Sequence, residues 1–320
     1  MSLLELKGLS ISFRTRPVEV VSDLSFQLNE GEVFGLVGES GCGKSLTALS
    51  IMGILPQNFK TGGVVNLRGR NLLSLGPEEM RDIRGREIGM VFQEPMTSLN
   101  PVLRVGYQIA EAVTSHFRVS KEEARERTLE LLKAVRMPSP HVRMKEYPHQ
   151  MSGGMRQRVM IAMAIACNPA VLIADEPTTA LDVTIEAQIL ELLNGLMESG
   201  NMAVLLITHD LGIIRENAKQ VAIMYAGRLV EKSPVEGIFT AARHPYTIGL
   251  MESLPGQRGV ALKPIPGSVP KPGMLPPGCK FSDRCRFMKP ECQADEPPLR
   301  QVTEGHFSRC IRAEEMRWPS

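Results

Sequence analysis

Residues 33–45 read VFGLVGESGCGKS, and this stretch decides the fold. Its first five residues are apolar or glycine, which is typical of a β-strand buried on both faces. The next eight fit the pattern G-x-x-x-x-G-K-S/T, and a helical pattern begins at Lys44. A strand that opens through glycines into a helix is one half of a parallel α/β unit.

This glycine-rich loop has the composition of a phosphate cradle. Its glycines let backbone N–H groups turn toward a chain of phosphates, and the start of the helix adds positive potential. Lys44 would reach the terminal phosphates, and Ser45 would offer its hydroxyl to Mg²⁺. The alternative is an ordinary turn between a strand and a helix, but the strand-loop-helix setting favours nucleotide binding. The residues predicted to contact the nucleotide are Gly38, Glu39, Ser40, Gly41, Cys42, Gly43, Lys44 and Ser45.

The rest of the main domain follows the same pattern. Short buried runs recur at 88–92, 171–174 and 202–207, with helical stretches between them. The first thirty residues alternate apolar and polar side chains, which is typical of half-buried antiparallel strands. We therefore predict an α/β fold with a mostly parallel core sheet, an antiparallel β subdomain and a helical subdomain inserted at about 94–165.

The composition changes near residue 250. Of the 23 prolines, 10 lie between Pro255 and Pro298, a density that breaks both helices and sheet ladders. We therefore divide the chain into a main domain at residues 1–250 and a small, loop-rich extension at residues 251–320.

Charge and hydropathy exclude several classes of protein. The 37 Lys and Arg residues nearly balance the 35 Asp and Glu residues, so the net charge of +2 does not favour nucleic acid as a partner. The longest apolar run, Val159 to Cys167, is far shorter than the roughly 20 residues of a spanning helix. The N-terminus has no basic leader followed by an apolar stretch, so we expect a cytoplasmic protein that does not cross the bilayer.

Two carboxylates stand at the end of the buried run VLIADE. The carboxyl edge of such a sheet is where ligands bind, so Asp175 and Glu176 are candidate site residues. Asp175 would hold Mg²⁺ through its hydration shell, and Glu176 would orient and polarise a water for in-line attack on the γ-phosphate. The alternative is a solvated acidic pair that opens the turn before Pro177, an interpretation that the phosphate loop makes weaker.

A second glycine-containing helix start lies at Ser152, Gly153 and Gly154, before the apolar run at 159–167. Such a start offers free N–H donors and a favourable dipole end to an anion. Because one chain needs only one phosphate cradle, a second suggests that two chains meet head to tail around ATP. At this point the sequence resembles the ATP-binding cassette (ABC) ATPases.

The resemblance covers most of residues 1–250 and lies in the order and spacing of six motifs. It implies that Gln93 senses the γ-phosphate and Mg²⁺, that His209 contacts the γ-phosphate, and that Mg²⁺ is held by Ser45, Gln93 and Asp175. Phe13 is the candidate for stacking on adenine, with a phenylalanine of the strand core as the alternative. The motifs are the phosphate loop, Gln93, the signature Ser152–Gly154, the pair Asp175 and Glu176, the turn ending at Asp182, and His209.

One residue differs from the usual signature motif, which has glutamine at the position of Met155. The polar contact of that side chain is therefore missing, whereas the phosphate contacts expected of Ser152 and of the two glycine N–H groups remain. This leaves open whether the site that this signature completes on a partner subunit turns over at full rate.

Four of the six cysteines fall in the last 42 residues, with the spacing C-x5-C-x6-C-x17-C. A reducing compartment disfavours disulfides, and polar, proline-rich flanks disfavour a core role. Structural zinc usually shows tight cysteine pairs, whereas wide loops can envelop an iron–sulfur cluster, so spacing alone leaves both open. Cys42 and Cys167 are interpreted as non-ligands. The four candidate ligands are Cys279, Cys285, Cys292 and Cys310.

The stretch His244-Pro245-Tyr246-Thr247, the prolines and the four cysteines together are similar to the C-terminal extension of the peptide and nickel importer subfamily of ABC ATPases. This resemblance implies that all four cysteines hold a 4Fe-4S cluster. It also implies a peripheral subunit on the cytoplasmic face of the cell membrane. In bacteria that have two membranes, this is the inner membrane. There the subunit would hydrolyse ATP to power import of di- or oligopeptides.

The implied partners are a second, homologous but non-identical ABC ATPase subunit, two permease subunits and a substrate-binding protein. ATP binding would join the two ATPases, hydrolysis would release them, and the helical subdomain would pass the motion to the permeases. The alternatives are an importer of nickel or another solute, and a soluble ABC scaffold protein whose tail is a metal-dependent docking module.

Overall fold

The structure, a computed structural model, describes residues 2–94, 98–179, 181–198, 202–254 and 264–316. The chain divides into two compact units. The helical unit comprises Leu28–Glu32 and Ser74–Leu205. The strand-rich unit comprises Ser2–Gln27, Val33–Leu73 and Leu206–Ser320.

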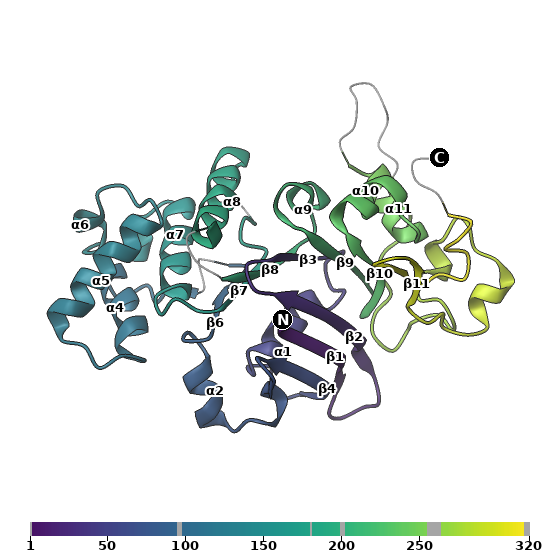
Figure 1. The fold of residues 1–320 in the computed structure, drawn as a ribbon, viewed down its shortest axis with the longest axis horizontal. Coiled ribbons are helices and arrows are strands. Elements are labelled where there is room, and N and C mark those ends of the chain that lie inside the picture. Colours follow the sequence, from purple (N-terminus) through teal and green to yellow (C-terminus); the bar gives the residue numbers. More distant parts are fainter. Residues whose placement is uncertain (1, 95–97, 180, 199–201, 255–263, 317–320) are drawn as a thin grey trace. The chain divides into compact units, whose positions relative to one another are not determined.

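The strand-rich unit begins with a four-stranded sheet. Its strands are β1 (Ser2–Phe13), β2 (Glu19–Asn29), β4 (Phe59–Leu67) and β5 (Arg70–Asn71). Their order is β2-β1-β4-β5, and β1 runs antiparallel to β4, from Leu4 opposite Leu67 to Phe13 opposite Phe59. The apolar residues of β1 and β2 are buried, at alternate positions along most of each strand but also at the adjacent pairs Leu3–Leu4 and Val20–Val21. Figure 1 shows β1, β2 and β4 side by side.

A second group of strands in this unit contains its parallel pair. These strands are β3 (Val33–Val37), β9 (Gln220–Tyr225), β10 (Arg228–Pro234), β11 (Arg300–Thr303) and β12 (His306–Ser308). They lie in the order β11-β12-β10-β9-β3, in which β3 and β9 are parallel and the other pairs are antiparallel. Two strands of the predicted extension therefore continue this sheet beyond β10. Neither strand was predicted, because the density of prolines before them indicated a loop-rich extension, whereas both strands begin after Pro298, the last proline of that dense stretch.

Short helices connect these strands. They are α1 (Lys44–Ile51), α9 (Leu211–Asn217), α10 (Val235–Ala241) and α11 (Pro245–Glu252), with 3-10 turns η3 (Ser282–Arg284) and η4 (Pro290–Gln293). Asp210 caps α9, since its Oδ1 accepts a hydrogen bond from the Gly212 N–H at 2.6 Å. Because α1 starts at Lys44, the phosphate loop lies between the end of β3 and the first turn of a helix, as predicted.

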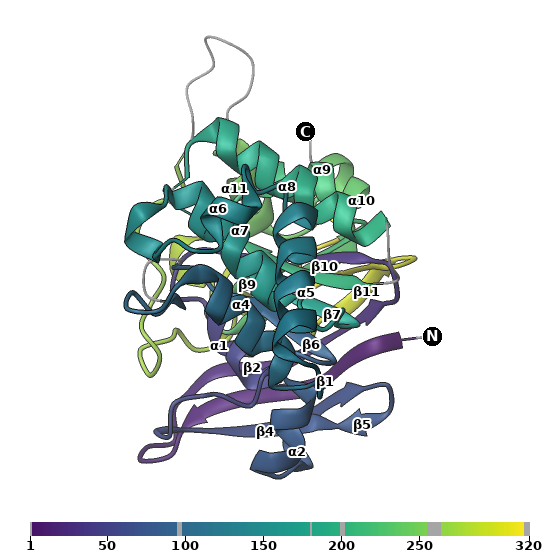
Figure 2. The same cartoon turned by 90° about the vertical axis from the view of Figure 1, so that its left-hand side faces the viewer.

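The helical unit holds a parallel strand pair and most of the helices. The strands are β6 (Ile88–Val91) and β7 (Val171–Asp175), and β8 (Ala203–Thr208) begins in this unit and ends in the other. The helices are α2 (Pro77–Ile83), α4 (Val105–Thr114), α5 (Lys121–Ala134), α6 (Pro140–Arg143), α7 (Gly153–Ala164) and α8 (Val183–Glu198), with 3-10 turns η1 (Leu72–Ser74) at its edge and η2 (Pro148–Gln150). Figure 2 shows α4, α5 and α7 packed together, and Ile109, Leu132 and Ile161 are completely buried in them.

The predicted fold class is confirmed: the chain combines a parallel core, an antiparallel β subdomain and inserted helices. The predicted boundaries at 94–165 and near residue 250 stay predictions. Over the described ranges, no helix has both the length and the apolarity that crossing a membrane requires.

Candidate nucleotide site and cysteine cavity

The phosphate loop depends on its glycines for its backbone shape. Gly41 and Gly43 have φ angles of 81° and 106°, in the left-handed region that L side chains rarely adopt. A Cβ at Gly38 would collide with the carbonyl oxygen of Met224 in β9, so only glycine fits where the strand ends. The loop is therefore fixed by both its conformation and its packing.

Lys44 folds back over this loop. Its side chain is only 5% exposed, and its Nζ donates hydrogen bonds to the carbonyl oxygens of Gly38 at 2.7 Å and Glu39 at 3.3 Å. The ammonium group is thus placed at the mouth of the cradle, where phosphate oxygens could replace these carbonyls. Ser45 follows it and is half-buried, and Ser40 and Gly41 are exposed.

A residue of the HPYT stretch also contacts the loop. His244 is completely buried, which lowers its pKa to about 3, and its neutral Nδ1 accepts a hydrogen bond from the Tyr246 N–H at the start of α11. Tyr246 in turn accepts a hydrogen bond at its Oη from the Glu39 N–H at 3.0 Å. This contact joins residues 207 positions apart, so no local sequence pattern predicted it.

In the helical unit, Gln93 and Glu176 meet. The Nε2 of Gln93 donates to Glu176 Oε2 at 3.0 Å, and the Thr179 hydroxyl donates to the same oxygen at 2.9 Å. Glu176 is 8% exposed and has a φ of 46°, because the chain turns sharply after β7. Asp175, the last residue of β7, is buried as well. The carboxylate of Glu176 is therefore held in one orientation by two donors.

The signature residues stand at the exposed start of α7. Ser152 is the N-cap, and its Oγ accepts a hydrogen bond from the Met155 N–H at 3.4 Å. Ser152 and Gly153 are exposed and Gly154 is half-buried, so this helix start is open to an anion from outside the unit. Asp182 behaves differently, because its Oδ1 accepts from the Ile185 N–H at 3.0 Å and thereby caps α8. Its predicted nucleotide contact stays a prediction.

Two candidates of the strand-rich unit lie at strand ends. His209 follows β8 and is exposed, and the neighbouring Asp210 N–H donates to the Thr208 hydroxyl at 3.0 Å. Phe13, at the end of β1, is half-buried, with Phe59 at 4.9 Å between ring centroids and the Arg16 guanidinium 4.3 Å from its ring centre. These contacts leave both interpretations of Phe13, adenine platform and strand-core residue, as predictions.

The four tail cysteines line one cavity. Its wall also includes His244, Phe281 and Arg312. Burial above all, with a smaller contribution from the neighbouring cysteines, raises the pKa of Cys279 to about 11 and that of Cys310 to about 12. Burial raises the pKa of Cys285 in the same way. Among the described residues, no group of three or more His, Cys, Asp or Glu is arranged so that it could hold a metal ion.

A backbone hydrogen bond joins two of the cysteines that line this cavity. The Cys279 N–H donates to the Cys292 carbonyl oxygen at 2.8 Å, and a Cβ at Gly278 would collide with that same carbonyl. Gly278, with a φ of 62°, therefore allows the chain to return on itself, and it brings cysteines with wide sequence spacing to one place. Cys42 and Cys167 are absent from the residues that line this cavity.

A glycine-rich strand-to-helix loop, a lysine over that loop and a buried acidic strand end define a phosphate-loop nucleotide-binding protein. Comparison with known proteins narrows this class. Residues 21–179 match the family model described as ABC transporter, and residues 230–292 match the model described as oligopeptide/dipeptide transporter, C-terminal region. The chain belongs to the ABC transporter family of ATP-binding proteins.

Individual proteins and solved structures of this family are similar to the chain over most of its length. A putative peptide import ATP-binding protein of Brucella ovis is 50% identical over 331 residues, covering 98% of this chain and 98% of that protein. A probable peptide ABC transporter ATP-binding protein of Sinorhizobium fredii is 50% identical, covering 98% and 96%. Among solved structures, a dimeric ATP-binding cassette in a post-hydrolysis state, bound to ADP and Pi, is 29% identical with a TM-score of 0.64, covering 72% of this chain and 98% of that chain.

Proposed function

We propose that this chain is the ATP-hydrolysing subunit of a membrane importer for di- or oligopeptides. One observation carries the substrate class: relatives named for peptide import are 50% identical over 98% of the chain, and its residues 230–292 match the C-terminal region of oligopeptide and dipeptide transporters. The resemblance found in the sequence leads to the same proposal from the HPYT stretch and the cysteines.

Nucleotide binding begins at the phosphate loop. Backbone N–H groups of Gly41 to Ser45 would face the phosphates, and the Lys44 ammonium would exchange the carbonyls of Gly38 and Glu39 for phosphate oxygens. Ser45, Gln93 and Asp175 supply a hydroxyl, an amide oxygen and a carboxylate, which are the hard oxygen donors that suit Mg²⁺. When bound, Mg²⁺ neutralises charge on the phosphate oxygens.

Hydrolysis would use Glu176 as the base. Its carboxylate, oriented by the Gln93 amide and the Thr179 hydroxyl, would accept a proton from a water aligned with the γ-phosphate. His209 would donate a hydrogen bond to the γ-phosphate. Because Gln93 touches Glu176 directly, a shift of Gln93 would move the base.

The exposed helix start at Ser152 would complete the nucleotide site of a partner ATPase. The dimeric cassette to which this chain is similar supports such a pairing. In the full assembly we propose a second, homologous ATPase, two permease subunits and a substrate-binding protein, on the cytoplasmic face of the cell membrane.

The test is purification of the complex from membranes, followed by its ATPase activity with candidate solutes. We expect permeases and a second ATPase to co-purify, and di- or oligopeptides with their binding protein to stimulate hydrolysis. Stimulation by nickel in place of peptides would contradict the substrate class. A chain recovered without permeases would support the scaffold alternative.

We further propose that Cys279, Cys285, Cys292 and Cys310 hold a 4Fe-4S cluster. A single zinc ion needs thiolates about 2.3 Å from the metal, whereas a 4Fe-4S cube is larger and needs its thiolates farther apart. Four cysteines that line one cavity would supply the four thiolates that such a cluster takes, and this grouping supports the proposal. When bound, the cluster supplies cationic iron that favours the thiolate form of these cysteines.

Iron content tests this assignment. Anaerobically purified protein should be brown with about four irons per chain, and Cys292→Ser should lose most of that iron because one thiolate of the cavity is missing. The control is Cys167→Ala, which removes a buried cysteine outside the cavity and should retain the iron. A colourless, zinc-loaded wild-type protein would contradict the cluster.

A further inference from the structure

The C-terminal extension contacts the phosphate loop through one ion pair. The Nη1 of Arg284 lies 3.0 and 3.1 Å from the two carboxylate oxygens of Glu39, 245 residues away in the sequence. Glu39 is the second residue of the loop, and Arg284 immediately precedes Cys285. The Arg284 side chain is 7% exposed and that of Glu39 is 29% exposed, so water screens this pair less than a surface pair.

Arg284 is held in place by its own surroundings. Its Nε donates to the Pro266 carbonyl oxygen at 2.8 Å, and its Nη1 also contacts the Tyr225 hydroxyl at 3.4 Å. The guanidinium lies 5.9 Å from the ring centre of Phe281, which is itself buried. A planar guanidinium with several donors engaged has one orientation, so it fixes the carboxylate that it binds.

Glu39 is in turn held at each of its polar groups. Its carboxylate is paired with Arg284, its N–H donates to Tyr246 Oη, and its carbonyl accepts from Lys44 Nζ. Tyr246 is completely buried, so this side of the loop rests on a rigid surface. Lys44, which would bind phosphate, and Arg284 of the extension therefore both contact the same residue, Glu39.

The charges of this ion pair predict whether it strengthens or weakens nucleotide binding. An unpaired carboxylate in the loop would repel a nucleotide triphosphate, and a guanidinium next to it offsets that repulsion. Arg284 thus acts on the nucleotide through Glu39, by placing the loop and by neutralising its one acidic side chain.

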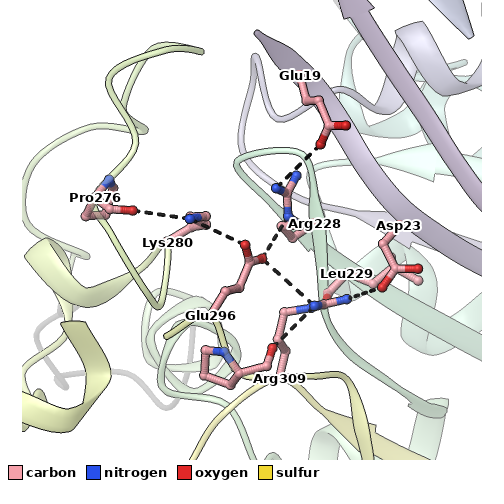
Figure 3. Close-up of polar contacts among 9 residues, drawn as sticks. Glu19, Asp23, Arg228, Leu229, Pro276, Lys280, Glu296 and Arg309 are labelled. Atoms are coloured by element: carbon pink, nitrogen blue, oxygen red, sulfur yellow. Dashed lines mark hydrogen bonds and ion pairs between the residues drawn. The ribbon is translucent and has the colours of Figure 1, made fainter. Parts of the chain in front are cut away.

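A separate network anchors the extension, so loss of Arg284 should leave the extension folded. Figure 3 shows Glu296 of the extension between Arg228 at 2.7 Å and Lys280 at 3.4 Å. Arg309 extends this network, with Asp23 at 3.1 Å. These ion pairs join the extension to β10 and to β2, and none of them involves Arg284 or Glu39.

We propose that Arg284 is a positioning residue of the nucleotide site, through which the cysteine-bearing extension sets the affinity of the phosphate loop for ATP. The proposal rests on the assignment of Gly38 to Ser45 to the nucleotide phosphates. According to this proposal, the extension contributes to the ATP site as well as containing the four cysteines. A rearrangement around Cys285 would move its neighbour Arg284 and with it the Glu39 carboxylate.

The test is titration of the purified full-length chain with a fluorescent ATP analogue. Arg284→Gln should raise the Kd for ATP about tenfold, as expected for loss of one partly buried charge pair, with kcat nearly unchanged in the assembled complex. Arg284→Lys should retain part of the affinity for ATP, because lysine keeps the positive charge. It should not retain all of it, because lysine lacks the planar, multi-donor guanidinium that orients the Glu39 carboxylate. The matched control is Arg286→Gln on the other side of Cys285, where Arg286 pairs with Glu252 at 2.6 Å and is half-exposed.

A double variant separates positioning from folding. Glu39→Gln combined with Arg284→Gln should bind ATP more tightly than Arg284→Gln alone, since the uncompensated carboxylate is gone. If the double variant binds no better, Arg284 acts only on stability and the proposal fails. The proposal fails also if Arg284→Gln and Arg286→Gln have the same Kd for ATP while Lys44→Ala no longer binds ATP. If Lys44→Ala itself keeps the wild-type affinity, the underlying assignment of the loop is wrong.

Discussion

Replacement of Lys44 by alanine should raise the Kd for ATP about 100-fold, the size of effect expected when a buried lysine loses its charge-assisted hydrogen bonds to phosphates. Lys44 lies over the loop with its ammonium on two backbone carbonyls, so its charge is already in place before nucleotide arrives. Alanine leaves those carbonyls facing the site with no positive charge to offset them. Isothermal titration of the purified chain with ATP measures the change.

The matched control for this variant is Lys60→Ala. Lys60 is exposed on β4 in the same strand-rich unit, outside the loop, so its removal should leave the Kd for ATP at the wild-type value. Wild-type affinity in Lys44→Ala would show that the glycine loop is only a turn.

Replacement of Glu176 by glutamine should lower ATP turnover by about 10² to 10⁴, the range for removal of a general base, with little change in ATP affinity. Glutamine has almost the same shape and can still accept a hydrogen bond from Thr179, but it cannot take a proton from water. The loss should therefore be in kcat, and nucleotide-bound complex should accumulate. Turnover is measured in the assembled complex, in which the proposed partner ATPase would complete the site.

Glu191→Gln is the matched control for this second variant. Glu191 lies in the same helical unit and is 66% exposed, paired with Arg136 on the surface, so its substitution should leave turnover unchanged. Equal turnover in Glu176→Gln and Glu191→Gln would remove Glu176 from the mechanism.

Local sequence patterns predicted the parts of the fold that depend on near neighbours. The run at 33–45 predicted β3, the loop and the start of α1 because burial, glycine and the helix start all lie within thirteen residues. The acidic pair at 175–176 was predicted at a strand end for the same reason, and β7 ends at Asp175.

Contacts between distant segments could not be predicted in this way. The pairing of β12 with β10 and the ion pair of Arg284 with Glu39 join segments separated by more than seventy residues, and no periodicity in either segment specifies its partner. The cysteine spacing was ambiguous for a related reason. Its meaning depends on the chain reversal at Gly278 and on the Cys279–Cys292 backbone bond, both of which are set by the tertiary fold.

The resemblance supplied the order of Gln93 and Glu176 but not their contact. Their hydrogen bond places a glutamine against the proposed base, which gives the residue pair a physical relation that two separate motifs do not express. For Asp182 the structure shows a helix cap that the resemblance does not express, and the nucleotide contact that the resemblance implies stays a prediction.

The central claim is that the open helix start at 152–154 grips the nucleotide of a partner ATPase. Hydrogen exchange of this segment, measured with and without ATP, tests it most directly. We predict that the N–H groups of Gly153 and Gly154 become protected when ATP is added to the assembled ATPase pair, and that ATP leaves them unprotected in the isolated chain. Exchange in the pair that stays the same with and without ATP would contradict the claim.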